Sequence, residues 1–426
     1  MTVNALSYLR SVANDIIGGC TFEKETAYLG ENRKRRLLLP SGDEKYGSFW
    51  LRDCAMMTES GLVPDDTLKE YVLIFASHGQ NGGDGRELKN GLYVPPYAMC
   101  DHLNYDGGAV FYPGTYSSGD DQGDGRCGFL PPLGDNYYFI LMSQQYISQS
   151  GDKGILSLPA SGMPLITRLE KAFGGYCVDP KTGLCVTDME RRAVDWGFCD
   201  TMIKTGYLLM PSILRFNAAK AMAEMTDDSE KRERYLHERE KIKRSIVDLL
   251  YDGGSGWLWS ASGVCRQHDV WATAYAVYSG VLDGDENRLK KTLSAIRDGY
   301  ISGRAVRNGA VRHILTDEDW FSDSAWEMTG GVKKGTYQNG GWWPTATGWY
   351  IYSLRQADRE SAISCLKDHI AFTAAGQADG TPYEWFNPDT GERSGLRYGT
   401  SAALPYAAAK RLAMECPEAA EITAEI

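Results

Sequence analysis

The chain has 426 residues, of which 43% are hydrophobic, so it is longer than most single-core domains and can bury a large core. Its formal net charge of -11 and pI near 5.2 exclude a nucleic-acid partner, because phosphate binding requires a basic face. The stretch 1–19 interrupts its apolar positions with Arg10, Asn14 and Asp15, so we expect no signal peptide, no membrane span and a cytoplasmic protein.

Cysteine and histidine spacing indicates that the protein holds no tightly bound transition metal, and we expect no cofactor. None of the ten cysteines forms a Cys-x-x-Cys pair, and none of the six histidines lies in a His-x-x-x-His pair. Asp120, Asp121 and Asp124 could offer oxygens to Ca²⁺, but they lack the spacing of an EF-hand loop. We interpret them as a solvated acidic loop, with a structural Ca²⁺ as the open alternative.

Helical periodicity recurs along the chain, and long loops rich in Gly and aromatic residues separate the helices. The first predicted helix, at 3–17, carries an apolar stripe with helical spacing, and a charged loop follows it. A long irregular insertion, about 80–133, is either functional or disordered, as so long a loop in a compact protein usually is, and its aromatic residues favour a function. The other predicted helices span 65–78, 137–149, 155–172, 202–225, 230–250, 270–281, 286–301, 345–355, 362–375 and 401–413.

The spacing of the loops predicts the architecture. Six loops with aromatic or carboxylate residues each precede a helix, about 70 residues apart on average; they are centred on Asp53, Asp135, Asp195, His268, Trp342 and Glu384. Such a repeat indicates stacked helical hairpins, and six hairpins closed into a ring would place all six loops on one rim. We therefore predict an all-α fold, an (α/α)6 toroid that forms one domain over 1–426, with short hairpins in the loops. An open helical solenoid is the alternative.

The last of these loops, Gly380–Gly391, holds a carboxylate between aromatic rings. Tyr383, Trp385 and Phe386 surround Glu384, and a rigid Asn-Pro-Asp-Thr-Gly turn follows. The rings would desolvate the carboxylate and raise its pKa, and their flat faces suit sugar rings. The eleven Trp and twenty-five Tyr, many of them in Gly-rich loops, also indicate a small carbohydrate partner. The alternative interpretation of this loop is a surface turn with a solvated glutamate.

Two opposed carboxylates would allow hydrolysis of a glycosidic bond. An acid protonates the leaving oxygen, and in inverting enzymes a second carboxylate, about 6.5–9.5 Å away, activates water. Asp195 opens the third loop-helix unit and Glu384 opens the sixth, so a six-fold ring would place them opposite each other. An N-terminal helix cap is the alternative role for Asp195.

Four segments, in order, resemble the six-hairpin glycosidases. They are similar to the Arg-Asp, Val-Asp-Ser-Gly, His-Asn-Gly-Gly-x-Trp-Pro and Pro-Glu-Tyr segments of the neutral/alkaline invertases; here they are Phe49–Asp53, Ala193–Gly197, Gly335–Pro344 and Pro382–Phe386. The Glu384 loop also resembles the Glu-x-Tyr-x-Pro-x-Thr-Gly segment of the family containing processing α-glucosidase I and mannosylglycerate hydrolase. The resemblance covers about residues 46–410.

The resemblance implies an inverting, cofactor-independent hydrolase of a small oligosaccharide or glycoside, with an α-linkage preferred, Asp195 as general acid and Glu384 as general base. Arg52 and Asp53 match an Arg-Asp pair that grips sugar hydroxyls in related barrels. The other residues expected to contact substrate are Trp50, Trp196, Gln338, Asn339, Trp342, Trp343 and Trp385.

Several alternatives stay open. Asp195 is followed by Trp-Gly where the invertases have Ser-Gly, and the Gly-Trp-Asp-x-Ser of the α-glucosidase and trehalase group is absent. Asp188, Glu190 and Asp200 therefore compete for the acid role, and Glu327 competes for the base. A sugar 2-epimerase of the same barrel would need paired histidines, and a non-catalytic carbohydrate-binding protein would need only the aromatic residues. The oligomeric state is not determined by the sequence.

Overall fold

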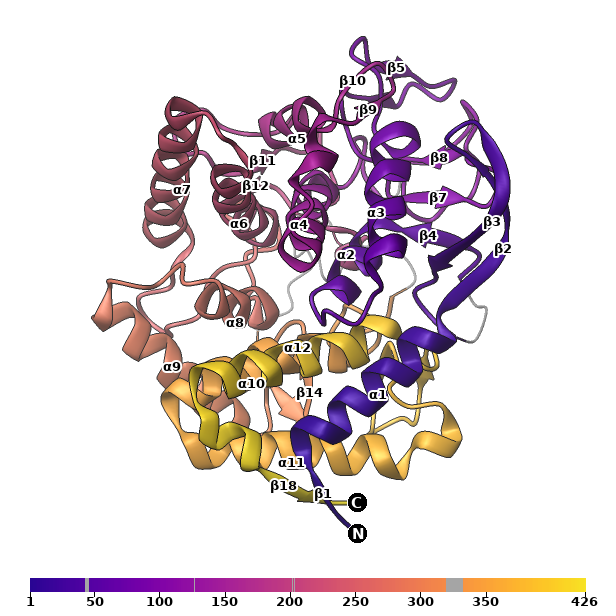
Figure 1. Ribbon diagram of the computed structural model, residues 1–426. Coiled ribbons are helices and arrows are strands. Elements are labelled where there is room, and N and C mark those ends of the chain that lie inside the picture. The colour runs from indigo at the N-terminus through magenta and orange to yellow at the C-terminus, as the bar shows by residue number, and fades with distance from the viewer. Residues whose placement is uncertain (43–45, 126, 201, 203, 319–331) are drawn as a thin grey trace.

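The computed structural model describes residues 1–42, 46–125, 127–200, 202, 204–318 and 332–426. In these residues the chain forms twelve α-helices and several small antiparallel sheets (Figure 1). The helices are α1 (Ala5–Gly19), α2 (Leu51–Thr58), α3 (Asp65–Ile74), α4 (Leu133–Ser150), α5 (Leu165–Gly174), α6 (Leu209–Met225), α7 (Ser229–Leu250), α8 (Val270–Tyr278), α9 (Glu286–Ile301), α10 (Thr347–Ala357), α11 (Arg359–Ala375) and α12 (Gly399–Glu415). The predicted helical character is confirmed.

The even-numbered helices contact one another in a closed cycle. The helix α2 packs against α4, and the contacts continue through α6, α8, α10 and α12, which packs against α2 again. Each remaining helix packs against a member of this set: α1 against α12, α3 and α5 against α4, α7 against α6, and α9 and α11 against α10. The strand β1 (Thr2–Asn4) pairs with β18 (Thr423–Glu425), so the two chain ends lie side by side (Figure 1).

Residue composition explains the two sets of helices. All eight residues from Val270 to Val277 of α8 are buried, and a helix that is apolar on every face is stable only inside a core. By contrast, α7 buries only Tyr235, Ile242, Ile246 and Leu250, which form one stripe on an otherwise charged helix. None of the helices in the described part of the chain is long and apolar enough to cross a membrane.

A long hairpin replaces the charged loop that was predicted after the first helix. The strands β2 (Thr21–Tyr28) and β3 (Glu31–Leu38) pair along their full length, and opposite charges face each other where Glu23 pairs with Arg36. Arg35 points inward, and its Nε lies 2.7 Å from Glu70 Oε1. The loop prediction is wrong here, because the many charges on both strands hide the alternation of apolar residues.

Two of the predicted aromatic loops join in one five-stranded antiparallel sheet. Its order is β13 (Val306–Arg307), β14 (Ala310–Arg312), β15 (Trp342–Trp343), β16 (Trp385–Phe386) and β17 (Arg393–Ser394). Trp342 pairs with Phe386 across β15 and β16, and Glu384 directly precedes β16. The sheet therefore holds the Glu384 loop in place, and the all-α class holds only for the larger elements.

Before α4 begins at Leu133, the described residues of the insertion 80–133 form no helix. Its strands are β5 (Arg86–Glu87), β6 (Tyr93–Val94), β7 (His102–Asn104) and β8 (Ala109–Val110). The strand β7 lies between β8 and β4 (Ser48–Trp50), with Trp50 opposite His102. The insertion is thus attached to the segment that leads into α2.

Helix starts account for most remaining differences from the prediction. The predicted helix 155–172 begins only at Leu165, because Pro159, Gly162 and Pro164 belong to the hairpin of β9 (Pro159–Ala160) and β10 (Met163–Pro164). The predicted helix 202–225 begins at Leu209, after β12 (Gly206–Tyr207), which pairs with β11 (Val186–Thr187).

Candidate functional site

A cavity of about 150 Å³ lies where loops from distant parts of the chain meet. Four carboxylates line it, together with a guanidinium group, an imidazole and several aromatic rings. The lining residues are Pro40, Tyr46, Trp50, Arg52, Asp53, Asp101, His102, Pro113, Gly114, Thr115, Tyr116, Phe198, Asp200, Tyr337, Glu384 and Tyr398.

Glu384 is held firmly at this cavity. Its backbone N–H donates to the carbonyl oxygens of Ser394 (3.0 Å) and Gly395 (2.6 Å), and its Oε2 accepts a 2.6 Å hydrogen bond from the Tyr46 hydroxyl. Gly395 has a φ of +62°, and a Cβ atom there would lie 2.4 Å from Glu384 Cβ. Only glycine allows both the backbone conformation and this close approach.

Arg52 and Asp53 lie in the first turn of α2 and face the same cavity. Asp53 Oδ1 accepts a 2.8 Å hydrogen bond from the Tyr398 hydroxyl. Burial, with a smaller contribution from the Glu384 charge, raises the pKa of Asp53 to about 6, although Arg52 and Tyr398 oppose this shift. The cavity therefore contains a carboxyl group that exchanges its proton near neutral pH.

A second carboxylate, Asp101, joins Arg52 to a histidine. One oxygen of Asp101 forms an ion pair with the Arg52 guanidinium, and Oδ2 lies 2.8 Å from His102 Nδ1. Burial alone would raise the pKa of Asp101, but the Arg52 charge and the His102 contact outweigh it, so the pKa lies below its usual value. His102 Nε2 makes no hydrogen bond within the described residues.

Aromatic rings form part of the cavity wall. The Trp50 ring centroid lies 4.6 Å from that of His102 and 5.9 Å from that of Tyr116. Tyr116, from the insertion, lines the cavity and is 53% exposed. Such an exposed ring offers a flat apolar face for a ligand.

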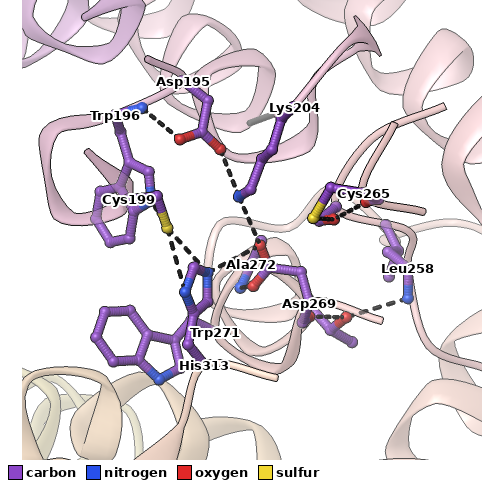
Figure 2. Close-up of polar contacts among 12 residues, drawn as sticks. Asp195, Trp196, Cys199, Lys204, Leu258, Cys265, Asp269, Trp271, Ala272 and His313 are labelled. Atoms are coloured by element: carbon purple, nitrogen blue, oxygen red, sulfur yellow. Dashed lines mark hydrogen bonds and ion pairs between the residues drawn. The ribbon is translucent and has the colours of Figure 1, made fainter. Parts of the chain in front are cut away.

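The segment 195–204 contributes Asp200 and Phe198 to the cavity. Asp195 is not among the lining residues; it is 2% exposed, and its Oδ2 lies 2.7 Å from Lys204 Nζ. Figure 2 shows the Asp195 carboxylate facing the Lys204 ammonium group. Of the alternatives for the acid role, Asp188 and Glu190 are exposed and do not line the cavity. Among these acidic residues, Asp200 alone lines it.

The remaining predicted contact residues do not line this cavity. Trp343 packs behind it: its ring centroid lies 5.8 Å from that of Phe198, and its Nε1 donates to the Tyr337 carbonyl at 3.0 Å. The other predicted contacts that do not line the cavity are the buried Trp196, Gln338, Asn339 and Trp342 and the half-buried Trp385. Of the nine predicted sugar contacts, Trp50, Arg52 and Asp53 therefore line the cavity, and a substrate role for the others stays a prediction.

Glu327, the alternative base, lies outside the described residues, as do Trp320 and Trp326. Within the described ranges, no group of three or more His, Cys, Asp and Glu side chains is placed to hold a metal ion.

Sequence reasoning missed several lining residues. Asp101 and His102 are adjacent in the insertion, and this carboxylate–imidazole pair was the one local signal that could have been found. Tyr46 and Tyr398 stand in loops without a distinguishing pattern. Tyr337 lies in the Gly335–Pro344 segment, but nothing in that segment sets it apart from its neighbours, and only the folded chain brings the three tyrosines together.

Comparisons with known proteins establish similarity of fold. No protein-family model and no curated protein matches the chain. Among solved structures, a glycosidase superimposes with a TM-score of 0.58 at 13% identity and covers 96% of this chain and 98% of its own. The GH63 mannosylglycerate hydrolase from Thermus thermophilus in complex with glucose gives 0.55 at 12% identity, with 94% and 99% covered.

A rhamnosidase from Klebsiella oxytoca with rhamnose bound also gives a TM-score of 0.55, at 14% identity; the match covers 94% of this chain but only 63% of the rhamnosidase. These neighbours are all glycosidases, as the resemblance to six-hairpin glycosidases predicts, and the chain shares their fold.

Proposed function

We propose that this protein is a glycoside hydrolase that cleaves a small oligosaccharide or glycoside with inversion of configuration. The observation that carries the proposal is the cavity in which Glu384 and three other carboxylates lie among aromatic rings. Carboxylates accept hydrogen bonds from sugar hydroxyls, carboxyl groups can give a proton to a glycosidic oxygen or take one from water, and aromatic faces stack on sugar rings. The glycosidase fold of the neighbours supports this combination.

In this proposal Glu384 is the general base. Its ionised carboxylate takes a proton from a water molecule as the water oxygen attacks the anomeric carbon. The Tyr46 hydroxyl donates to Oε2 and so fixes the orientation of the carboxylate. The rigid support from Gly395 and the sheet would keep the carboxylate in position during the reaction.

Asp200 is the general acid that we favour, in place of Asp195. The acid must reach the glycosidic oxygen and donate a proton as the bond to the anomeric carbon breaks. Asp200 lines the cavity, whereas Asp195 is held by Lys204 behind it. Arg52 and Asp53 would bind sugar hydroxyls, as the resemblance implies, and no cofactor takes part.

The insertion supports a short substrate. It provides Asp101, His102 and residues 113–116 of the cavity wall, so one side of the cavity is covered. We propose a substrate of two or a few sugars with an α-linkage, hydrolysed in the cytoplasm. The closed cycle of helix contacts and the paired chain ends support a single-domain (α/α)6 toroid as the scaffold.

The test is anomer-resolved proton NMR of the protein with a panel of α- and β-linked disaccharides and aryl glycosides. We expect turnover in which the anomer formed first is opposite to the linkage of the substrate. A first-formed anomer that retains the configuration of the substrate would overturn the inverting mechanism. Absence of turnover over the whole panel would overturn the hydrolase proposal.

Two variants separate the catalytic roles from general damage. Glu384→Gln keeps the shape of the side chain but removes the base, and we expect a loss of about 10²–10⁴-fold in kcat with retained sugar binding. Glu392→Gln is the matched control, because Glu392 lies in the same loop and is exposed. Equal activity of both variants would contradict the role of Glu384. Sugar binding by the native protein without any turnover would instead favour a non-catalytic carbohydrate-binding protein.

The epimerase alternative is not favoured. It needs an acid and a base from paired histidines, and His102 is the one histidine that lines the cavity in the described residues.

A further inference from the structure

The segment that carries Asp200 and Phe198 is tied at both ends. At its start, the carbonyl oxygen of Asp195 accepts a 2.9 Å hydrogen bond from Gly134 N–H, in the first turn of α4. At its end, Lys204 Nζ lies 2.7 Å from Asp195 Oδ2, so the two ends meet in an ion pair. The residues that reach the cavity lie between these two points.

The ion pair continues into α8. Lys204 Nζ lies 3.9 Å from Asp269 Oδ2, and Asp269 caps α8 by accepting a 2.8 Å hydrogen bond from Ala272 N–H through Oδ1 (Figure 2). Asp269 Oδ2 is also 3.2 Å from His313 Nε2. The ammonium group therefore connects the segment to the start of α8, which is buried from Val270 to Val277.

A second set of contacts reaches the residue beside Asp200. Cys199 Sγ lies 3.2 Å from His313 Nδ1 and accepts a 3.3 Å hydrogen bond from Trp196 Nε1. Figure 2 shows Cys199 between the Trp196 and His313 side chains. The Phe198 ring is 5.2 Å from that of Trp196 and 5.8 Å from that of Trp343. The residues on the N-terminal side of Asp200 are thus packed on both faces.

The charges in this cluster need a reason, because a buried ion pair seldom stabilises a protein more than apolar residues of the same size would. The Asp195 and Lys204 side chains are each 1% exposed. Burial alone would lower the pKa of Lys204, but Asp195 and Asp269 raise it well above its usual value, so the ammonium group stays charged. The contacts of this ammonium group with Asp195 and Asp269 are directional, so they favour one conformation of the segment.

We infer that Asp195 and Lys204 are positioning residues, whose ion pair holds Asp200 at the cavity in the orientation needed to protonate the leaving group. The inference rests on the proposed role of Asp200 as the general acid. It also gives Asp195 a role that accounts for its position behind the cavity wall. Neither residue touches the substrate.

The kinetic test compares leaving groups. In Lys204→Met, we expect kcat/KM for an unactivated disaccharide to fall by about 10²-fold or more, since misplaced acid catalysis is lost. A dinitrophenyl glycoside of the same sugar should lose less than about tenfold, because its phenolate leaves without protonation. Lys220→Met is the matched control, since Lys220 is an exposed lysine paired with Glu224. Equal losses on both substrates in Lys204→Met would overturn the inference.

Two further variants distinguish loss of the ion pair from a general loss of folding. Asp195→Asn keeps the shape of the side chain, and Asp195→Asn combined with Lys204→Met removes both charges of the ion pair. If the pair acts as a unit, the double variant shows the same leaving-group pattern as Lys204→Met and loses no further activity. If Asp195→Asn shows this pattern but Asp200→Asn does not, Asp195 is itself the acid and the inference is wrong.

A measurement without substrate separates this inference from the proposed function. Hydrogen exchange of peptides covering 195–204 should become faster in Lys204→Met, while peptides from α7 keep their exchange rates. Unchanged exchange in 195–204 would refute the ion pair as a constraint. If the native protein hydrolyses no glycoside, the proposed function fails, and the exchange result still decides whether the ion pair holds the segment.

Discussion

The pKa of Asp53 leads to a pH-dependent change in stability that can be measured directly. Burial raises this pKa from 3.8 to about 6 in the folded protein. The difference is 6 − 3.8 = 2.2 units, which corresponds to about 3 kcal/mol at 1.36 kcal/mol per unit. A raised carboxyl pKa means that folding favours the protonated form. Its contribution to stability is therefore complete below about pH 4 and is lost as the pH rises through about 6.

Asp53→Asn mimics the protonated carboxyl group at every pH and keeps an oxygen that can accept from Tyr398. Relative to the native protein, we expect the variant to gain about 3 kcal/mol in free energy of unfolding between about pH 4 and about pH 7.5. Urea unfolding at several pH values measures this difference. Asp227→Asn, at a position that is 94% exposed, controls for the substitution itself. A difference between Asp53→Asn and the native protein that does not change with pH would refute the reasoning.

Three other substitutions, one of them with a matched control, test the lining of the cavity and the β2–β3 hairpin. Gly395→Ala would place Cβ 2.4 Å from Glu384 Cβ, so we expect at least a tenfold loss of kcat. Gly391→Ala is the control, because a Cβ atom there meets open space. It should cost only about 1–2 kcal/mol of stability and leave kcat intact. Tyr116→Ala should raise KM and change the free energy of unfolding by less than about 0.5 kcal/mol, because the ring is half exposed; an unchanged KM would exclude stacking. Arg35→Met removes the buried cation that pairs with Glu70 and donates to the Tyr28 carbonyl, so we expect urea unfolding to show a destabilisation of about 3–5 kcal/mol. A loss below about 1 kcal/mol would show that Arg35 does not stabilise the hairpin.

Part of the candidate site was accessible from local sequence. Trp50, Arg52 and Asp53 follow one another closely before and within a helix, and Glu384 stands in a loop of aromatic and turn residues. Their positions depend on short-range features, namely a helix start and a tight turn. These features are encoded in a few adjacent residues, so the sequence identifies all four as candidates, and all four line the cavity.

The acidic residues around 195–200 show where local reasoning stops. Asp195 and Asp200 lie five residues apart in one segment, and the sequence alone is compatible with either carboxylate lining a cavity. In the folded chain Asp195 lies against Lys204, whose ammonium group also approaches Asp269 from a distant part of the chain, and Asp200 lines the cavity. No pattern near Asp195 indicates that Lys204 turns back toward it.

The sequence by itself determined the helical class, most helix positions and the loop that carries Glu384, because helical periodicity, proline and glycine act over a few residues. Only the tertiary structure decided that β2 and β3 pair, that the insertion brings His102 opposite Trp50, and that Asp195 faces Lys204 instead of the cavity. These features depend on burial and charge pairing in a particular packed arrangement, and the pairing of Trp50 with His102 also joins segments that lie far apart in the chain.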